Sequence, residues 1–440
     1  MKIRLLIFVI FIFCTAALNA QTVNLRLSTY FYSWQRIDSI NNPSSNKTTH
    51  IQGYQSLFLD VNKNKWSFNT LVQTEEDVIH KIDRGFSYRF FNLYVKGTNL
   101  YNMLDVKLGR EYVFAGVGKG SIDGLYFKLK AGKNKEYQLT GYAGYSTPLD
   151  YEFNRYPAIK NSYMAGAQFS YYGVKDLIAS ASYMNSHIKP ESYTALRYDT
   201  LMNVKEVTVD INPPAENLVG VDFNYLYLAK HNFYGKAYYD ITTRQLYRAE
   251  ANVRVNVYKN LNVSADYLYR QPQLSYNTIF WVFEHKANME IEGGADYTLK
   301  NGINIYARAT DVIYNKSLDV TTGLKSNSLR LQVGFSHPSF GLSYVKYTGY
   351  TGESDGATGY LFRQLIPEKL SATLSLGYSS YRLGQFTGDK VNAFSGMLGL
   401  TCRPIPQLSI DAQGQFINNR IYKTDTRFLL GVNYWLFKKY

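Results

Sequence analysis

Residues 247–257 carry the clearest structural signal in the chain, because two kinds of side chain alternate along them without a break. The stretch reads Tyr-Arg-Ala-Glu-Ala-Asn-Val-Arg-Val-Asn-Val. One register is apolar or aromatic throughout, and the other holds Arg248, Glu250, Asn252, Arg254 and Asn256. Successive side chains of a β-strand point to opposite faces of its sheet. The stretch therefore predicts a strand with one apolar face and one charged face.

The same alternation recurs along the chain in about 22 segments, and helical periodicity is absent. Tight polar turns follow the even-numbered segments, at 62–65, 132–135, 173–176, 258–260, 300–302 and 403–406. Mostly longer loops follow the odd-numbered segments, at 37–50, 76–83, 147–160, 188–216, 271–282, 315–325, 349–357, 382–389 and 418–424. Alternating short and long connections are typical of a membrane barrel with short periplasmic turns and longer outer loops. The segment 242–245 is a short outer connection, so a count of 18 to 22 strands is acceptable.

Composition favours the same architecture. The chain has 41 Tyr and 25 Phe in 440 residues, and membrane barrels place such amphipathic rings at both interfaces. No stretch after the first 20 residues is long and apolar enough for a helical span. A soluble β-sandwich array or propeller is the structural alternative, but no internal repeat of fixed period is present. We predict an all-β, antiparallel, up-and-down transmembrane barrel in the outer membrane of a Gram-negative cell.

Residues 1–20 have the three-part form of a secretory signal peptide. Lys2 and Arg4 precede an apolar run, and a small-residue region closes at Ala20, which predicts cleavage before Gln21. Residues 21–440 are then a single barrel domain with both ends in the periplasm. The domain keeps one cysteine, Cys402, and therefore has no intrachain disulfide.

The charged register of the wall is the candidate functional site. Arg or Lys on a lipid face would cost about 2–4 kcal/mol near the midplane, so this register is expected to face the interior. The predicted pore-lining residues are Lys128, Lys130, Asp222, Arg248, Glu250, Arg254, Glu290, Glu292, Arg308 and Arg330. An interior with both signs of charge is hydrated, which predicts a water-filled or plugged lumen. The alternative is that these residues only pair with one another and stiffen the wall.

Two local resemblances support a barrel. Phe428, Leu430, Val432, Tyr434 and Leu436 alternate with polar or small residues near the chain end. The segment resembles the closing strand by which the barrel-assembly machinery recognises outer-membrane barrels, although Lys438 and Lys439 precede the terminal Tyr440.

Residues 107–111 read Lys-Leu-Gly-Arg-Glu, and residues 123–125 read Asp-Gly-Leu. This pair of segments resembles porin-like families, whose members carry Leu-Gly-Arg and Asp-Gly pairs near this position. We expect Gly109 and Gly124 to bend the wall, and Arg110, Glu111 and Asp123 to form a charged rim at the outer mouth. The resemblance implies a porin-like channel without naming a substrate.

Other chemistry has little support. Basic residues are spread singly, which argues against nucleic-acid binding despite a net charge of +14. Residues 352–356 match G-x-S-x-G, but we expect a flexible outer loop there and no helix after it. The six histidines lack metal-site spacing, and residues 116–120 lack the end of a phosphate loop. Glu75, Glu76 and Asp77 are expected at a solvated loop tip. We predict no enzyme activity, cofactor or metal.

We therefore predict a channel for passive diffusion of small hydrophilic solutes, with a mild anion preference from the excess of Lys and Arg. Its expected partners are outer-membrane lipid, the assembly machinery and the solutes, and protein partners are unknown. The alternative is a non-transport barrel that anchors an envelope complex or forms its sleeve. A TonB-dependent transporter also has about 22 strands, but the first strand of the mature chain is expected to begin at once, near Thr22. We therefore expect no room for an N-terminal plug domain, which argues against active uptake.

Overall fold

The structure is a computed structural model, which describes residues 21–38, 48–79, 85–148, 150–153, 156, 158–198, 200, 202–272, 287–314, 327–350, 352–383 and 388–440. The predicted signal peptide lies outside the described residues. So do large parts of the expected outer loops 37–50, 271–282, 315–325 and 382–389.

Strands make up nearly all of the described chain. They are β1 (Thr22–Asp38), β2 (Thr49–Lys63), β3 (Trp66–Ile79), β4 (Ser87–Leu100), β5 (Leu104–Ala115), β6 (Gly118–Ala131), β7 (Tyr137–Ser146), β8 (Ser162–Tyr171), β9 (Leu177–Ile188), β10 (Tyr193–Tyr198), β11 (Val204–Val209), β12 (Glu216–Tyr227), β13 (His231–Asp240), β14 (Gln245–Tyr258), β15 (Leu261–Arg270), β16 (Asn288–Thr298), β17 (Asn304–Tyr314), β18 (Asn327–His337), β19 (Phe340–Gly349), β20 (Gly352–Ile366), β21 (Leu370–Leu383), β22 (Val391–Ile405), β23 (Leu408–Asn418) and β24 (Tyr422–Lys439). The described residues contain one helical turn, Ile159–Asn161. No helix among them has the length and apolar character needed to cross a membrane.

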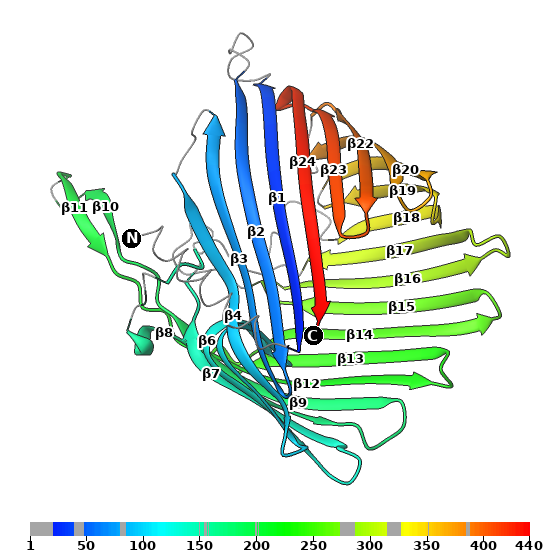
Figure 1. Ribbon diagram of the computed structural model, residues 1–440. Helices are drawn as coiled ribbons and strands as arrows, with labels where there is room; N and C mark the ends of the chain where they lie inside the picture. The colour runs from blue at the N-terminus through cyan, green and yellow to red at the C-terminus, as the bar shows by residue number, and fades with distance from the viewer. Residues whose placement is uncertain are drawn as a thin grey trace, which may run out of the picture.

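The strands form a closed antiparallel barrel. In the described part of the chain, 22 strands pair with their sequence neighbours, and β9 pairs directly with β12. β1 and β24 close the sheet, with Thr22 opposite Lys439 and Gln35 opposite Thr426. In Figure 1, β1, β2 and β24 on the front wall run crosswise to β13–β17 behind them, as tilted strands do when seen through a barrel. The predicted fold class and strand number are confirmed.

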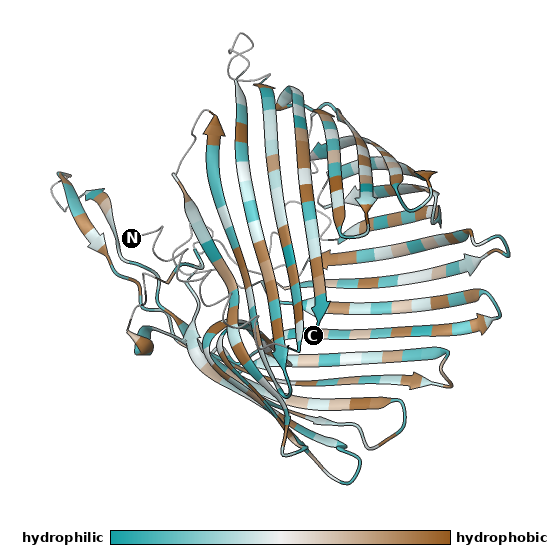
Figure 2. Ribbon diagram, viewed as in Figure 1, coloured by the Kyte–Doolittle hydropathy of each residue, from teal (hydrophilic) through white to brown (hydrophobic). Residues whose placement is uncertain are grey.

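The two faces of the wall differ in chemistry. Leu329, Leu331 and Val333 are exposed on one face of β18, whereas Ser328 and Arg330 lie on the other. Figure 2 shows this alternation as brown and teal bands along the strands. Exposed apolar side chains on every second position suit a face in contact with lipid. The opposite register, with its charges, lines the interior.

The short turns lie where the sequence predicts them, but some of the longer connections are shorter than expected. Residues 352–356, expected in a flexible loop, begin β20, and Glu75–Asp77 lie within β3. Polar pairs continue the sheet beyond its apolar band, because Glu353 contacts Arg382 at 3.1 Å and Glu75 contacts Arg89 at 2.7 Å. These segments contain few apolar residues, so their alternation was hidden in the sequence.

The longest outer loop, 188–216, contains a separate hairpin. β10 and β11 pair only with each other in a two-stranded sheet. Figure 1 shows them projecting beyond the barrel on the side away from the C-terminus. The hairpin therefore stands outside the barrel and does not enter the lumen.

Candidate functional site

The hairpin of β5 and β6 leaves the wall and turns into the barrel. β5 pairs with β4 only as far as Arg110, and β6 pairs with β7 only from Ile122 onward. The two strands continue to pair with each other up to Ala115 and Gly118. The tip of the hairpin, residues 111–121, therefore has no strand pairing with β4 or β7, and side-chain packing and single hydrogen bonds hold it.

Glycines permit the bend. Gly109 has φ +130°, and a Cβ there would lie 2.2 Å from the carbonyl oxygen of Leu93. A Cβ on Gly124 would lie 2.2 Å from the carbonyl oxygen of Ala143. Only glycine allows this backbone conformation and these close approaches. The predicted bend at both glycines is present, and it directs the hairpin inward.

The inward hairpin packs on the charged face of the wall. Its buried side chains, Val113, Ala115, Val117 and Ile122, form a core with Tyr142, Met164, Met184 and Leu218. The amide of Val117 donates to Ser182 Oγ at 3.0 Å. Leu218 and Asp222 share one register of β12, and Met184 lies opposite Leu218, so this core lies inside the barrel. The hairpin therefore occupies part of the lumen.

The opposite face of the hairpin presents aromatic rings to the lumen. Tyr112 is 51% exposed and Phe114 is 75% exposed, although the neighbouring Val113 is fully buried. A strand that is buried on one face and exposed on the other alternates in this way. These rings are available to whatever enters the barrel.

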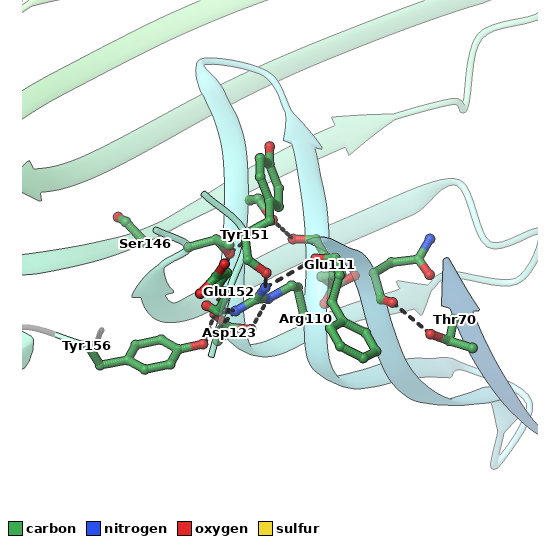
Figure 3. A network of polar contacts seen from close by, with 12 residues as sticks. Thr70, Arg110, Glu111, Asp123, Ser146, Tyr151, Glu152 and Tyr156 are labelled. Atoms are coloured by element: carbon green, nitrogen blue, oxygen red, sulfur yellow. Dashed lines mark hydrogen bonds and ion pairs between the residues drawn. The ribbon is translucent and has the colours of Figure 1, made fainter. Parts of the chain in front are cut away.

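Arg110 fixes the base of the hairpin, as Figure 3 shows. Its guanidinium binds both carboxylate oxygens of Asp123, at 2.7 Å and 3.0 Å. It also donates to the carbonyl oxygens of Phe90 at 3.1 Å and Tyr151 at 2.5 Å, and to the Tyr156 hydroxyl at 2.6 Å. One planar, fully buried side chain thus joins β4, β5, β6 and the loop after β7.

The prediction that Arg110, Glu111 and Asp123 form a charged rim at the outer mouth is wrong, because these residues form a buried network. Arg110 and Glu111 are each only 1% exposed, because the loop after β7 covers the bend. The Tyr156 hydroxyl donates to Asp123 Oδ2 at 2.6 Å. Burial and the neighbouring carboxylate raise the pKa of Tyr156 to about 12, so the hydroxyl keeps its proton at neutral pH. The network is buried, and it holds the bend of the hairpin against the loop after β7.

Eight of the predicted site residues lie on β12–β18 and form chains of polar contacts. Glu250 contacts Lys236 Nζ at 2.8 Å and the Arg248 guanidinium, and Asp222 accepts from the Tyr238 hydroxyl at 2.8 Å. Further along, three arginines bind three carboxylates: Arg330 to Glu292 at 2.9 Å and Glu290 at 3.9 Å, Arg308 to Asp296 at 3.5 Å and Glu292 at 3.9 Å, and Arg254 to Asp296 at 3.8 Å. Both groups of contacts together, from Asp222 on β12 to Arg330 on β18, are called the inner charge ladder.

The other two predicted residues lie on β6, away from the ladder. Lys130 pairs with Asp105 at 2.6 Å, and Lys128 lies opposite Asp105 in the strand register. All ten residues belong to the charged register. Their role as a permeation lining stays a prediction.

Sequence reasoning missed several partners of these residues. Lys236 and Tyr238 alternate with Ala237 and Tyr239 along β13, but tyrosines on both faces hide the pattern. Asp296 and Asp105 lie near strand ends, where alternation is short. The inward hairpin had one usable signal, the glycines at 109 and 124, but they do not reveal the direction of the bend.

Comparisons with known proteins agree on the architecture only. No family model matches the chain, and no curated protein matches it. A solved structure of a mutant ferric enterobactin receptor, PfeA from Pseudomonas aeruginosa, has a TM-score of 0.58 and 8% identity, covering 95% of this chain and 81% of that one. OccAB4 from Acinetobacter baumannii has a TM-score of 0.43 and 10% identity, covering 95% of this chain and 99% of its own. OccK8 from Pseudomonas aeruginosa also has a TM-score of 0.43 and 10% identity, covering 94% and 98%.

The chain is an outer-membrane β-barrel. The closed 22-stranded sheet and its exposed apolar register carry this conclusion. The likeness to the receptor supports the fold alone. The expected outer-membrane barrel architecture is confirmed, and passage of solutes, their identity and selectivity are matters for proposal.

Proposed function

We propose that this barrel is a porin-like channel for passive diffusion of small hydrophilic solutes. The β5–β6 hairpin narrows the path, and the inner charge ladder continues along the wall from β12, beside the hairpin, to β18. Solutes pass without a conformational cycle.

One observation carries the proposal: the described lumen is occupied by a short hairpin that packs along one side of the wall. Its buried core contacts β7, β8, β9 and β12, and Tyr238 of β13 and Tyr247 of β14 pack against it. No residue of β15–β18 is among the described members of that core, and these strands carry Glu290, Glu292, Arg308 and Arg330 of the ladder. A hairpin over one part of the wall and paired charges along the next part support a restricted aqueous path.

We further propose that anion preference is mild. Lys130, Arg248, Arg254, Arg308 and Arg330 each lie within 4 Å of a carboxylate. Paired charges nearly cancel at the distance of a passing ion, so only the surplus of basic groups contributes to selectivity. The expected selectivity is correspondingly weak.

Planar-bilayer recording on purified protein tests the channel. Stable conductance steps, with a reversal potential in a salt gradient displaced slightly toward the anion value, would support the proposal. A protein that inserts into the bilayer and shows no conductance would reject it. Heat-dependent gel mobility of the same preparation establishes that the barrel is folded.

A second candidate function is an anchor or sleeve for an envelope complex, and the β10–β11 hairpin favours it. Leu196, Tyr198 and Met202 are strongly exposed on this projection. Exposed apolar side chains on a projecting sheet suit a docking surface. Copurification of a stoichiometric partner together with a closed lumen would favour this function over the channel.

A further inference from the structure

A pocket of about 300 Å³ lies where the β5–β6 hairpin bends away from β4. Its lining includes Phe91, Asn92, Tyr94, Glu111, Tyr112 and Tyr151. Tyr94 shares the inner register with Lys107, and Tyr112 belongs to the exposed face of the hairpin. The pocket thus lies beside the exposed face of the hairpin, and its volume suits a small solute.

Two residues that line the pocket, Glu111 and Asn92, each carry a buried acceptor oxygen that lacks a donor among the described residues. Glu111 is 1% exposed, and its Oε2 accepts from Lys107 Nζ at 2.7 Å. Its Oε1 and Asn92 Oδ1 are buried, with no hydrogen-bond partner in the part of the chain that the structure describes. Buried acceptors are normally satisfied, so their position in a pocket points to a ligand that supplies donors.

Aromatic rings form the remaining walls. Phe91 and Tyr151 pack with ring centroids 5.2 Å apart, and Tyr112 stands half-exposed beside them. Ring faces offer flat apolar area to a ligand at low conformational cost. The ligand is therefore expected to have an apolar face as well as hydrogen-bond donors.

The charges of Lys107 and Glu111 limit the ligand class further. Lys107 Nζ already neutralises Glu111 and lies 5.2 Å from the Tyr94 ring centroid and 4.5 Å from that of Tyr126. A second ammonium group would be repelled by Lys107, and a carboxylate would be repelled by the unpaired oxygen of Glu111. A neutral ligand meets neither obstacle.

We propose that this pocket is a binding subsite for a neutral polyhydroxylated ring of monosaccharide size. Its hydroxyl groups donate to Glu111 Oε1 and Asn92 Oδ1, and its apolar face lies against Tyr112. The proposal deepens the channel function and rests on it, because a solute reaches the pocket through the lumen.

Binding is measured on the full barrel in a detergent without a sugar headgroup, by saturation-transfer NMR with methyl glucoside as the probe. Tyr112→Ala is expected to weaken binding by about fivefold, which is the worth of one aromatic contact. Phe114→Ala is the matched control, because Phe114 is exposed on the same face of β5 and does not line the pocket. Glu111→Gln, which replaces Oε1 or Oε2 by a donor, is expected to weaken binding as well.

Three outcomes would overturn the subsite: no saturation transfer to the wild-type protein, equal losses in Tyr112→Ala and Phe114→Ala, or tighter binding of glucosamine or glucuronate than of methyl glucoside. Conductance is recorded on the same preparation. Conductance without binding rejects the subsite and leaves the channel, whereas binding without conductance rejects the channel and leaves the subsite.

Discussion

Replacing Arg110 by Ala is the sharpest test of the inward hairpin. The substitution removes the guanidinium contacts that tie the bend to β4, to Asp123 and to the loop after β7. It leaves the Asp123 carboxylate mostly buried, with 17% of its side chain exposed. The wall itself keeps its strand pairing, so the effect is expected in the hairpin.

The free energy that keeps the hairpin docked in Arg110→Ala follows from two opposing contributions. Removing one partner of a buried ion pair costs about 3–5 kcal/mol. The hairpin remains attached through Val113, Val117 and Ile122, whose burial contributes roughly 1.5–3 kcal/mol each, or about 5–9 kcal/mol together. The difference is a few kcal/mol, which corresponds to an undocked population on the order of 1%. The wild-type hairpin, with both contributions, is expected to stay docked.

Single-channel recording detects this population. Arg110→Ala is expected to show brief upward current steps that are absent from the wild type, because an undocked hairpin widens the path. A pair of cysteines at Val117 and Ser182, in a Cys402→Ser background, provides the control, since the Val117 amide lies 3.0 Å from Ser182 Oγ. Oxidation of this pair should abolish the steps, and reduction should restore them.

The reasoning fails if Arg110→Ala has the same conductance, the same current noise and the same rate of cysteine cross-linking as the wild type. Such a result would mean that the hairpin is held without the guanidinium. A barrel that no longer shows heat-dependent gel mobility would instead show that Arg110 is needed for the wall.

Three further predictions concern the wall and the lumen. Val253→Arg places a charge on the lipid-facing register and is expected to destabilise the folded barrel by about 2–4 kcal/mol in urea titration. Asn252→Arg, on the inner register, should cost much less stability. Equal losses of stability would contradict the assignment of the two faces. Replacing Arg248 and Arg254 by Glu should displace the reversal potential toward the cation value, and an unchanged potential would remove both side chains from the permeation path. Gly220→Val adds a Cβ that would lie 2.5 Å from Cγ1 of Val117 in the docked hairpin. The overpacking costs about 1–3 kcal/mol and should raise the frequency of upward current steps. Unchanged current records would argue against docking of the hairpin on β12.

The barrel wall was predictable because lipid and water impose a period of two on every strand. In β14 the inner register alone contains charge, and that register turned out to include Arg248, Glu250 and Arg254. Turn positions followed from short polar segments between such strands. Outer loops were less predictable, since polar residues such as Glu353 extend strands above the apolar band without alternation.

The candidate site was only partly predictable. Its charges follow from the wall pattern, but their partners depend on strand register, which places Arg308 opposite Gly294 and close to Asp296. The hairpin was out of reach for a different reason. Val113 and Ala115 alternate with Tyr112 and Phe114 as a wall strand would, and nothing local reveals that the buried face meets Met164 and Leu218.

The seam between the chain ends has a consequence for biogenesis. β1 and β24 span 17 and 18 residues, and each completes the other's backbone hydrogen bonding along nearly its whole length. A barrel without β24 would display the bare edges of β1 and β23, and such edges recruit foreign strands. The sheet is therefore sealed only once β24 has docked between them.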